Sequence, residues 1–420
     1  MKKILVLGDN GETCEILERA KKRNVYTIAT DYNALEYSSA KRISDEYWMI
    51  STGDLDALEA KCLEENVDAV ISGASDFNIK MSILLAERLG LPCYCNETTW
   101  DAVTDKIIFK RIAREAGVSV PADYIVTKEL TSENLKNIVF PVMVKPIDLC
   151  ANAGISYCYT KKELIDAHQY ARSLTKREEI IVEQMLTGKE FFAYYVLAEG
   201  EAAFFTLGVR LSQPGEPRYC YSMNTSMNSF TEKYLEEMDA SVKKLLRKIG
   251  CREGIACVQC MMDSMENLYA IEMCYSVEAS ILLEPLAKVF NFDGIAWQLE
   301  CALGIKHTKE QLLRINKHNF ERCANSLILY ANKEGIVDEL NGFDIISRYS
   351  NIRMKLYVHL GDVIRKYYPL GIIMFDTDDC EQACRMLDII NETVHIINTS
   401  GEDVLIRFSD YDALRKEDQR

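Results

Sequence analysis

A glutamine and a glutamate lie in two neighbouring apolar segments, and their oxygens suit a metal–phosphate site. Gln259 lies in the segment that ends at Asp263, and Glu272 lies in the segment Tyr269–Ser276. A polar turn at Ser264–Asn267 separates the segments, which predicts an antiparallel strand pair with Gln259 and Glu272 close together. Magnesium prefers hard oxygen ligands, usually one or two carboxylates with phosphate oxygens and water. The pair therefore predicts a magnesium site.

Two lysines have the chemistry to neutralise phosphates. Lys145 closes an apolar run directly before Pro146, so its side chain can project from a strand end into a cleft. The alternative is a lysine that lies along a strand edge with its ammonium group in solvent. Lys106 lies on a predicted helix that ends at Gly117, and taken alone it is expected to be a solvated surface lysine.

The composition is that of a globular protein with two or three domains. Of the 420 residues, 48% are hydrophobic and 27% are charged, which excludes a disordered chain. The formal charge of −15 opposes binding to nucleic acids or anionic membranes, so an anionic ligand such as ATP needs a local basic pocket and a cation. No stretch reaches about 20 apolar residues. We therefore expect a cytoplasmic protein with no nucleic-acid or membrane partner.

The fifteen cysteines form no disulfide framework, and we expect them to be reduced and mostly buried. Cys257 and Cys260 form a lone CxxC motif without a second pair or a nearby histidine. Core packing is its expected role, and a zinc or redox site is the alternative. The five histidines are isolated in the sequence and fit no metal-binding spacing.

The first hundred residues alternate between predicted strands and helices. The strands are Lys3–Gly8, Val25–Thr30 and Ala69–Ser72, and the helices are Glu12–Lys22, Leu55–Glu65 and Phe77–Leu89. This alternation indicates βαβ crossovers and a Rossmann-like parallel sheet. The Gly8–Gly11 turn lacks the third glycine of a dinucleotide fingerprint, so a tight strand-to-helix turn is expected there. Asp76 follows a predicted strand, where ligands gather in such sheets, and is a candidate for the acceptor side of the site.

The rest of the chain mixes helices with short strands. Predicted helices are Trp100–Gly117 (capped by Thr99), Lys162–Ser173, Thr231–Ile249, Lys309–Asn319 and Cys380–Ile389. Predicted strands are Ile138–Pro146, Ser156–Tyr159, Ile180–Glu183, the hairpin Glu190–Glu199 with Ala202–Leu211, Ser326–Tyr330, Asp344–Ile346, Leu356–Val358, Ile372–Phe375, Thr393–Ile397 and Asp403–Phe408. The pattern changes after about residue 305, which indicates a separate C-terminal domain.

Five segments over roughly Met1–Leu303 resemble the ATP-grasp family. They are Asp105-Lys106 ahead of Gly117–Pro121, Phe140–Pro146, the loop Asp148–Gly154, Ile181–Glu190, and the Gln259–Ser276 strand pair. The carbamoyl-phosphate-synthase, biotin-carboxylase and amino-acid-ligase branches look most similar. The resemblance implies a Rossmann-like pre-ATP-grasp domain at 1–100, a two-subdomain α+β ATP-grasp fold at 101–305 with a lid at about 122–183, and a small α+β domain at 306–420.

The resemblance also implies roles for individual residues. Lys106 and Lys145 would bind phosphate, as would the loop in which Gly154 is the one clear glycine. Glu183 and the backbone at Met185 and Leu186 would contact the adenine edge. Glu190 would accept hydrogen bonds from the ribose hydroxyls, which suits a carboxylate because it is a pure acceptor.

The sequence departs from the family pattern after Glu272. The family has Glu-x-Asn-x-Arg, whereas Cys274 and Ser276 stand here in the places of the asparagine and the arginine. A thiolate suits softer metals than magnesium, and a serine cannot give positive charge to the transferring phosphoryl group. Candidates to compensate are Glu278 as a metal ligand and Arg210 and Arg218 as phosphate contacts, with surface charge as the alternative for both arginines.

The resemblance implies an ATP-dependent ligase that uses Mg2+, with Mn2+ as an alternative, to form an acyl phosphate and release ADP and phosphate. Its partners would be a small-molecule carboxylate and an amine, and a homodimer is implied because members often dimerise. A second hypothesis is an ATP-binding protein with a degenerate site, which acts as a sensor or scaffold with little or no turnover. A third hypothesis, a nicotinamide-dependent oxidoreductase, requires the incomplete glycine motif to bind NAD.

Overall fold

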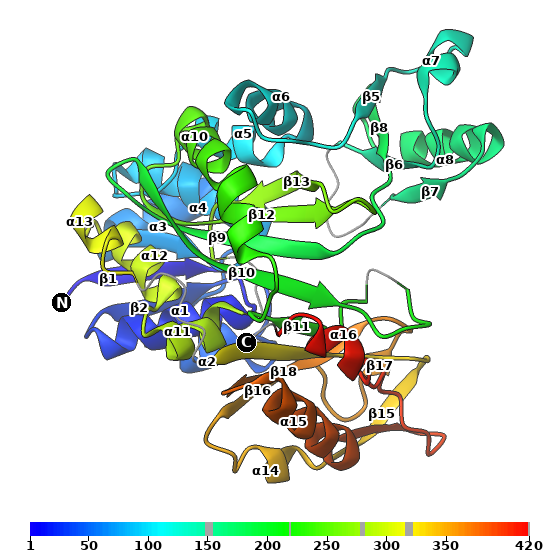
Figure 1. Cartoon of the computed structure of the whole chain (residues 1–420). Coiled ribbons are helices and arrows are strands. Elements are labelled where there is room, and N and C mark those ends of the chain that lie inside the picture. The colour runs from blue at the N-terminus through cyan, green and yellow to red at the C-terminus, as the bar shows by residue number, and fades with distance from the viewer. Residues whose placement is uncertain (148–153, 218–219, 278–281, 316–321, 419–420) are drawn as a thin grey trace.

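The computed structural model has an α/β fold, and it describes residues 1–147, 154–217, 220–277, 282–315 and 322–418 (Figure 1). Within these ranges the strands form a parallel four-stranded sheet, a second four-stranded sheet, an eight-stranded sheet and a three-stranded sheet. The fold class predicted from the sequence is confirmed.

The N-terminal sheet is parallel, with the strand order β3-β2-β1-β4. Its strands are β1 (Lys3–Leu7), β2 (Tyr26–Thr30), β3 (Glu46–Trp48) and β4 (Ala69–Ser72). The helices between and after them are α1 (Gly11–Lys22), η1 (Leu35–Tyr37), α2 (Ser39–Ile43), α3 (Leu55–Glu65) and α4 (Asp76–Leu89). Residues 4–7 of β1 are fully buried, as expected for a central parallel strand covered on both faces. The carboxyl end of β4 places Asp76 at the first position of α4.

One predicted helix is two helices in the structure. The prediction of a continuous helix over Trp100–Gly117 is wrong, because α5 (Glu97–Thr104) and α6 (Lys106–Ala116) meet at Asp105. The Asp105 carboxylate accepts hydrogen bonds from the two backbone N–H groups of residues 107 and 108, which starts a new helix there. The cap of α5 is Asn96 and not Thr99, whereas Gly117 ends α6 as predicted.

A small antiparallel sheet projects from the body of the molecule (Figure 1). Its strand order is β5-β8-β6-β7, with β5 (Asp123–Val126), β6 (Val142–Pro146), β7 (Ser156–Cys158) and β8 (Ile180–Gln184). The helices α7 (Ser132–Asn137) and α8 (Lys161–Leu174) belong to the same unit. Its core includes Val142, Val144, Leu164 and Val182. This unit lies within the segment predicted as the lid.

The eight-stranded sheet has the order β13-β12-β9-β10-β11-β14-β18-β16. Its strands are β9 (Glu190–Ala198), β10 (Glu201–Leu211), β11 (Met223–Thr225), β12 (Gly254–Met262), β13 (Leu268–Cys274), β14 (Cys323–Tyr330), β16 (Ile352–Leu356) and β18 (Pro369–Thr377). One face packs against α5, α6 and α10 (Ala240–Ile249), and the other packs against α1, α11 (Leu283–Phe290) and α12 (Gly294–Ala302). The predicted β9–β10 hairpin is confirmed. The helix predicted over Thr231–Ile249 is α9 (Thr231–Tyr234), a π turn (Leu235–Asp239) and α10.

The C-terminal segment contributes three strands to that sheet and builds a smaller sheet of its own. The three-stranded sheet contains β15 (Gly335–Asn341), β17 (Val363–Ile364) and β19 (His395–Asn398), and the helices are α13 (Lys309–Leu312), α14 (Phe343–Ile346), α15 (Cys380–Thr393) and α16 (Tyr411–Arg415). The strand predicted over Asp344–Ile346 is wrong, because these residues form α14. The strand predicted over Asp403–Phe408 is reduced to isolated bridges at Asp403 and Leu405.

An ionic cluster around the buried Arg19 joins the N-terminal sheet to the rest of the molecule. Arg19 on α1 contacts Glu15 on the same helix, Glu284 on α11 at 2.6 Å and Asp293 before α12 at 2.7 Å. Two cations of β16 complete the cluster: Lys355 contacts Glu15 and Arg353 contacts Glu284. The Arg19 side chain is only 7% exposed. Three cations and three carboxylates therefore balance one another at the junction.

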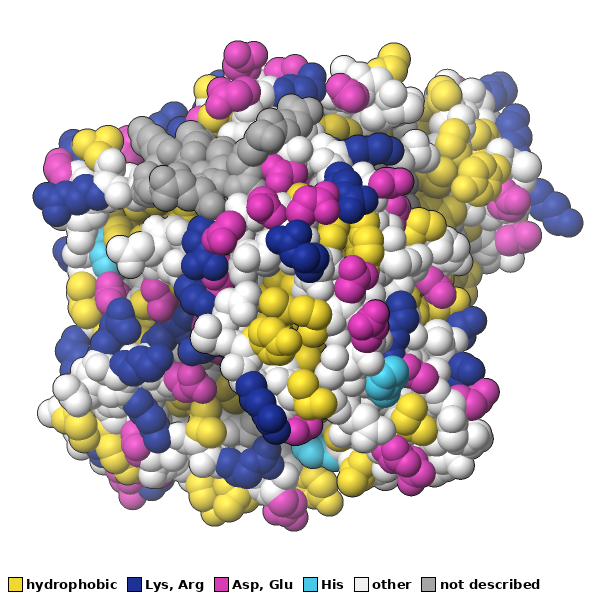
Figure 2. All heavy atoms as spheres, turned by 60° about the horizontal axis from the view of Figure 1, so that its bottom comes forward, with side chains coloured by type: hydrophobic (Ala, Val, Ile, Leu, Met, Phe, Trp, Pro, Cys, Tyr) yellow, Lys and Arg dark blue, Asp and Glu magenta, His cyan; other side chains and the backbone are white. Residues whose placement is uncertain are grey.

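Acidic and basic side chains are interspersed over the face that Figure 2 shows, so the net negative charge is not gathered there in one field. No helix in the described ranges has the length and apolar character needed to span a membrane.

Candidate nucleotide site

The predicted strand pair of the metal site is present. Strands β12 and β13 are antiparallel, and Gln259 lies directly opposite Glu272. A register shift follows Gln259, so the regular pairing is interrupted beside this residue. The Glu272 side chain is half-buried. The two oxygen-bearing side chains are thus neighbours on adjacent strands, as the sequence predicted.

Asp76 and Lys106 lie within electrostatic range of each other, and Glu272 influences Asp76. Burial and then the charge of Glu272 raise the pKa of the Asp76 carboxyl, whereas the Lys106 ammonium lowers it. Asp76 begins α4 and Lys106 begins α6, so two helix starts and β13 bring these charges together. The acceptor-side placement predicted for Asp76 stays a prediction, and its proximity to Glu272 is the new observation.

The second predicted phosphate lysine is anchored by a buried carboxylate. Lys145 on β6 forms an ion pair with Glu183 on β8, and Lys110 on α6 forms an ion pair with the other oxygen of Glu183. Glu183 and Lys110 side chains are each 1% exposed. Burial raises the pKa of Glu183, but the charges of Lys145 and Lys110 outweigh it and lower the pKa to about 2. Glu183 is therefore ionised at neutral pH and shared by two ammonium groups.

The adenine contact predicted for Glu183 stays a prediction, and the structure adds a second role. Both oxygens of the carboxylate bind lysines, so the side chain anchors two cations. Lys110 was not identified as a site residue from the sequence. A signal was present, because Lys110 follows Lys106 by one helical turn and lies among the buried residues Phe109 and Ala113 of α6. A lysine on a buried face of a helix indicates an ion pair.

The predicted hinge follows β8 directly. The Met185 N–H donates to the carbonyl oxygen of Pro141 at 3.1 Å, and the Leu186 side chain is buried. Gly188 donates from its N–H to Met262 at the end of β12. A Cβ atom at Gly188 would lie 2.4 Å from the Met262 carbonyl oxygen, so only glycine permits this close approach of the hinge to β12.

Glu190 binds three protein donors. Gln259 Nε2 donates to Glu190 Oε1 at 2.8 Å, Arg210 Nη1 donates to the same oxygen at 3.2 Å, and the Tyr221 hydroxyl donates to Oε2. The Glu190 residue is 5% exposed. The contact with ribose predicted for Glu190 stays a prediction, and the structure adds a second role, because Glu190 orients Gln259. Since the amide nitrogen of Gln259 is used in this way, its amide oxygen is the atom left for a cation.

Arg210 lies between two aromatic rings. Its guanidinium is 4.1 Å from the centre of the Phe192 ring and 5.2 Å from the centre of the Tyr221 ring. Arg210 is therefore fixed next to Gln259 by stacking and by Glu190. Tyr221, like Lys110, was not identified from the sequence, because it lies far from Glu190 along the chain.

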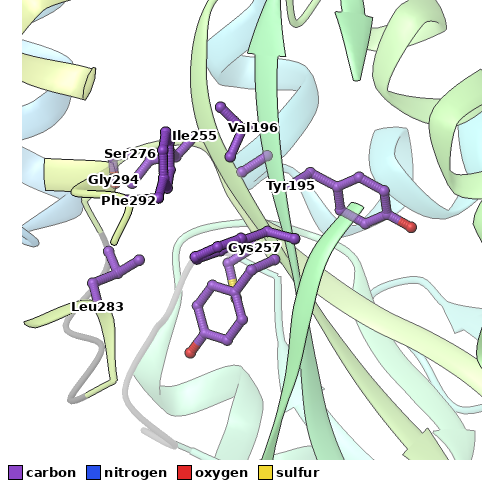
Figure 3. A pocket seen from close by; sticks show the side chains of 11 residues that line it. Tyr195, Val196, Ile255, Cys257, Ser276, Leu283, Phe292 and Gly294 are labelled. Carbon is purple, nitrogen blue, oxygen red and sulfur yellow. The ribbon is translucent and has the colours of Figure 1, made fainter. Parts of the chain in front are cut away.

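The two residues that replace the family's asparagine and arginine contact each other. Cys274 Sγ and Ser276 Oγ are 3.1 Å apart, and Ser276 is 2% exposed. Ser276 lines a pocket of about 10 Å³ together with apolar side chains that include Ile255, Phe292 and Leu283. Figure 3 shows these residues. A gap of this size holds no more than about one water molecule. Ser276 is therefore a packed residue without room for a long side chain.

Three further predicted site residues lie at or outside the limits of the described segments. Gly154, at the end of the predicted phosphate loop, has a φ of +76 and is packed so closely that a Cβ atom would lie 2.8 Å from Pro146. Arg218 and Glu278 lie outside the described residues, as does the loop 148–153.

The donor set fits magnesium. In the part of the chain that the structure describes, no three His, Cys, Asp or Glu side chains cluster in a way that would hold a metal ion. Glu272 and Gln259 supply one carboxylate and one amide oxygen, and magnesium usually takes its other ligands from phosphates and water. The cysteines of the CxxC motif are buried, and burial raises the pKa of the Cys260 thiol above its usual range.

Comparison with known proteins gives a consistent result. The model of the D-Ala–D-Ala ligase C-terminal family matches residues 112–275. The 2-oxoglutarate carboxylase small subunit of Hydrogenobacter thermophilus is 24% identical over 354 residues, which cover 77% of this chain and 72% of that protein. A D-alanine–D-alanine ligase of Listeria monocytogenes is 35% identical over 115 residues, but these cover only 25% of this chain and 30% of the ligase.

Solved structures share the fold over nearly the whole chain. The L-amino acid ligase of Bacillus licheniformis superposes with a TM-score of 0.79 at 17% identity, covering 95% of this chain and 99% of that one. The biotin carboxylase domain of the Hydrogenobacter carboxylase, solved as a dimer with MgADP, ADP and bicarbonate, gives a TM-score of 0.77 at 18% identity, covering 94% and 91%. The sequence and fold comparisons together support the ATP-grasp superfamily that the motifs predicted. The relatives named here are enzymes.

Proposed function

We propose that this protein is an ATP- and magnesium-dependent ligase that joins a small-molecule carboxylate to an amine. The observation that supports this best is the arrangement along α6. Lys106 begins the helix within range of Asp76, which Glu272 also influences, and Lys110 lies one turn later in contact with Glu183 and thus next to Lys145. One turn is about 5.4 Å long. A metal-binding carboxylate and a pair of buried lysines at this spacing suit a metal-bound polyphosphate.

Each side chain then has a role. Lys145 and Lys106 neutralise phosphate oxygens together with the loop that ends at Gly154. The backbone at Met185 and Leu186 contacts adenine, with the Met185 carbonyl as acceptor because its N–H is used by Pro141. Glu190 orients Gln259 and approaches the ribose.

Glu272 and Gln259 hold magnesium, with Mn2+ as an alternative, and Glu278 is a further candidate ligand. Magnesium, when bound, neutralises charge on the transferring phosphates. Arg210 and Arg218 are the candidates for the phosphate contact that the family's arginine would make.

The reaction would proceed in two steps. A carboxylate oxygen attacks the γ-phosphorus, the bond to the β-phosphate oxygen breaks and ADP leaves. The amine nitrogen then attacks the acyl carbon, phosphate leaves and the nitrogen loses a proton to solvent. Catalysis is positioning and charge neutralisation, and the lid at about 122–183 closes over residues of the 101–305 domain to exclude water. The proposal places the protein in the cytoplasm, with a homodimer as its assembly.

A second candidate function is ATP binding without efficient turnover, as in a sensor or scaffold. The contact between Cys274 and Ser276 favours it, because Ser276 is buried where the family pattern has an arginine. Loss of one such positive group costs about 3 kcal/mol in the barrier.

A test of the proposal is to measure ADP and phosphate release by the full chain with MgATP and a panel of amino acids offered as carboxylates and amines. Release that depends on a particular pair, and that falls at least 100-fold in Glu272→Gln, is the expected result. An exposed carboxylate far from the site, changed as Glu64→Gln, is the control and retains full activity.

MgATP binding without turnover on any pair contradicts the ligase proposal. ATP binding that is equally tight with a chelator present then supports the second function, because a degenerate site does not depend on the metal. A thermal shift with NAD and none with ATP would support an oxidoreductase instead.

A further inference from the structure

Lys110 is a buried lysine whose partners lie in a different part of the molecule. Its helix, α6, packs in the core formed with α5, α10 and one face of the large sheet. Glu183 and Lys145 lie on β8 and β6 of the small projecting sheet. The Lys110 and Glu183 side chains are 1% exposed and the Lys145 side chain is 6% exposed. The three side chains therefore form a closed ionic contact between the body and the projecting unit.

Among the residues that the structure describes, the charges in this contact do not balance. One carboxylate meets two ammonium groups, which leaves one positive charge in buried surroundings. Asp123 on β5 is the next carboxylate that faces Lys110, but it is paired with Arg114 of α6. Burial and the neighbouring Lys145 lower the pKa of Lys110, and the charge of Glu183 raises it. A buried excess charge is costly unless an anion offsets it.

We propose that Lys110 is a positioning residue of the nucleotide site, which shares Glu183 so that this carboxylate anchors Lys145 without neutralising it. A lysine paired with a carboxylate of its own would be well ordered but would have little net charge to offer a phosphate. A lysine without a carboxylate would keep its charge but lose its orientation. The shared carboxylate gives Lys145 both properties. This inference rests on the proposed nucleotide function.

The geometry also links Lys145 to the position of the projecting sheet. Because Lys110 belongs to the body and Lys145 to the projecting unit, the ammonium of Lys145 keeps its place only when β6 and β8 lie against α6. Lys106 begins the same helix within range of Asp76. One helix therefore fixes the two predicted phosphate lysines relative to each other.

The test is calorimetric titration of the full chain with MgADP. Lys110→Met makes Lys145 and Glu183 a balanced pair, and we expect its MgADP affinity to fall roughly tenfold or more. Lys110→Arg preserves the charge and the contact with Glu183, so its affinity stays within about threefold of the wild type. Lys248→Met is the matched control, and its affinity should be unchanged. Lys248 is a surface lysine of α10, and its ammonium lies 3.5 Å from Glu115 of α6, the helix that carries Lys110.

A double variant separates anchoring from charge. Lys110→Met with Glu183→Gln leaves Lys145 with its full charge but without an anchor, and its MgADP affinity is also expected to fall roughly tenfold. Its contact keeps the net charge of +1 that the wild type has, so it differs from the wild type in the anchor and not in the charge. Thermal melting establishes that each variant is folded at the assay temperature.

Two results would overturn the inference. Lys110→Met that binds MgADP within about threefold of the wild type shows that Lys110 has no part in the site. A double variant with wild-type affinity shows that charge matters and anchoring through Glu183 does not. Neither result touches the proposed function, which instead fails if the wild-type protein itself does not bind MgADP.

Discussion

Removal of Arg19 should destabilise the protein in a way that depends on pH. The cluster around Arg19 holds three cations and three carboxylates, and Arg19→Met leaves it with a net charge of −1. Glu15 and Glu284 then face each other with 6% and 12% of their side chains exposed. Breaking a buried pair by removing one partner costs about 3–5 kcal/mol, because the remaining charge is unpaired.

The dependence on pH follows from the two carboxyls. In the wild type, burial raises the pKa of Glu15, but Lys355 and other partners lower it to about 2. A carboxyl whose pKa is lowered by folding stabilises the folded state at pH values above its pKa in the unfolded chain. This stability is lost as the pH falls through the pKa of the folded state. In the wild type, burial raises the pKa of Glu284 above its usual value, and the charge of Arg19 offsets part of this rise. Without Arg19 both pKa values rise, so the folded variant takes up protons more readily than the folded wild type as the pH falls. Its deficit should shrink by about 1 kcal/mol or more between pH 7 and pH 5.

The assay is urea denaturation of wild type and variant at the two pH values, with midpoints and slopes compared. Arg23→Met, at the residue that follows α1, is the matched control, because Arg23 forms a partly exposed pair with Glu300 at 2.7 Å. Such a pair contributes about 1 kcal/mol or less, with little dependence on pH in this range. A deficit for Arg19→Met below about 1 kcal/mol, or one that grows as pH falls, would refute the electrostatic reasoning.

Three further predictions concern the site. Gly188→Ala should lower stability by about 1–3 kcal/mol in thermal or urea unfolding, because its Cβ would lie 2.4 Å from the Met262 carbonyl oxygen. Gly294→Ala, where the nearest atom is 3.5 Å away, should be neutral or stabilising, and equal effects at both positions would contradict this. The pKa of Glu183 is lowered to about 2, so this carboxylate should stabilise the folded protein at pH values above its pKa in the unfolded chain. The contribution should fade as the pH falls from about 5 towards 2, and Glu183→Gln should flatten that part of the stability–pH curve. Ser276→Arg should destabilise the protein by about 3 kcal/mol, measured by the same unfolding assay, because Ser276 is 2% exposed beside a gap of about 10 Å³. A stable, active Ser276→Arg protein would show that the segment rearranges.

The fold was predictable where local patterns repeat. The parallel sheet follows from apolar strands that alternate with amphipathic helices, and the β9–β10 hairpin follows from two long apolar runs around a turn. The pairing of Gln259 with Glu272 was predictable for the same reason, because a short turn joins their strands. A short predicted strand was wrong. Ile345 and Ile346 favour a strand by composition, but they form one helical turn after Gly342, whose φ is +79.

The candidate site was predictable in its residue types and less so in its contacts. Lys145 and Glu183 were both selected from the sequence, yet their contact with each other joins residues 38 positions apart. Lys110 contacts Glu183 across 73 positions, so helical spacing could indicate that Lys110 is buried but not which carboxylate it contacts. The break at Asp105 was also missed, because an aspartate inside an apolar periodic segment can either face solvent or cap a new helix. Only packing decides between these outcomes.

The eight-stranded sheet limits how this chain can be shortened or recombined. The pairing of β11 with β14 places Asn224 opposite Ser326, so strands from both sides of residue 305 share one set of hydrogen bonds. A fragment that stops near residue 305 would leave β11 as a bare edge, and exposed edges recruit other chains into aggregates. A chimera that exchanges the C-terminal segment with that of a relative must therefore preserve the register of β11 with β14.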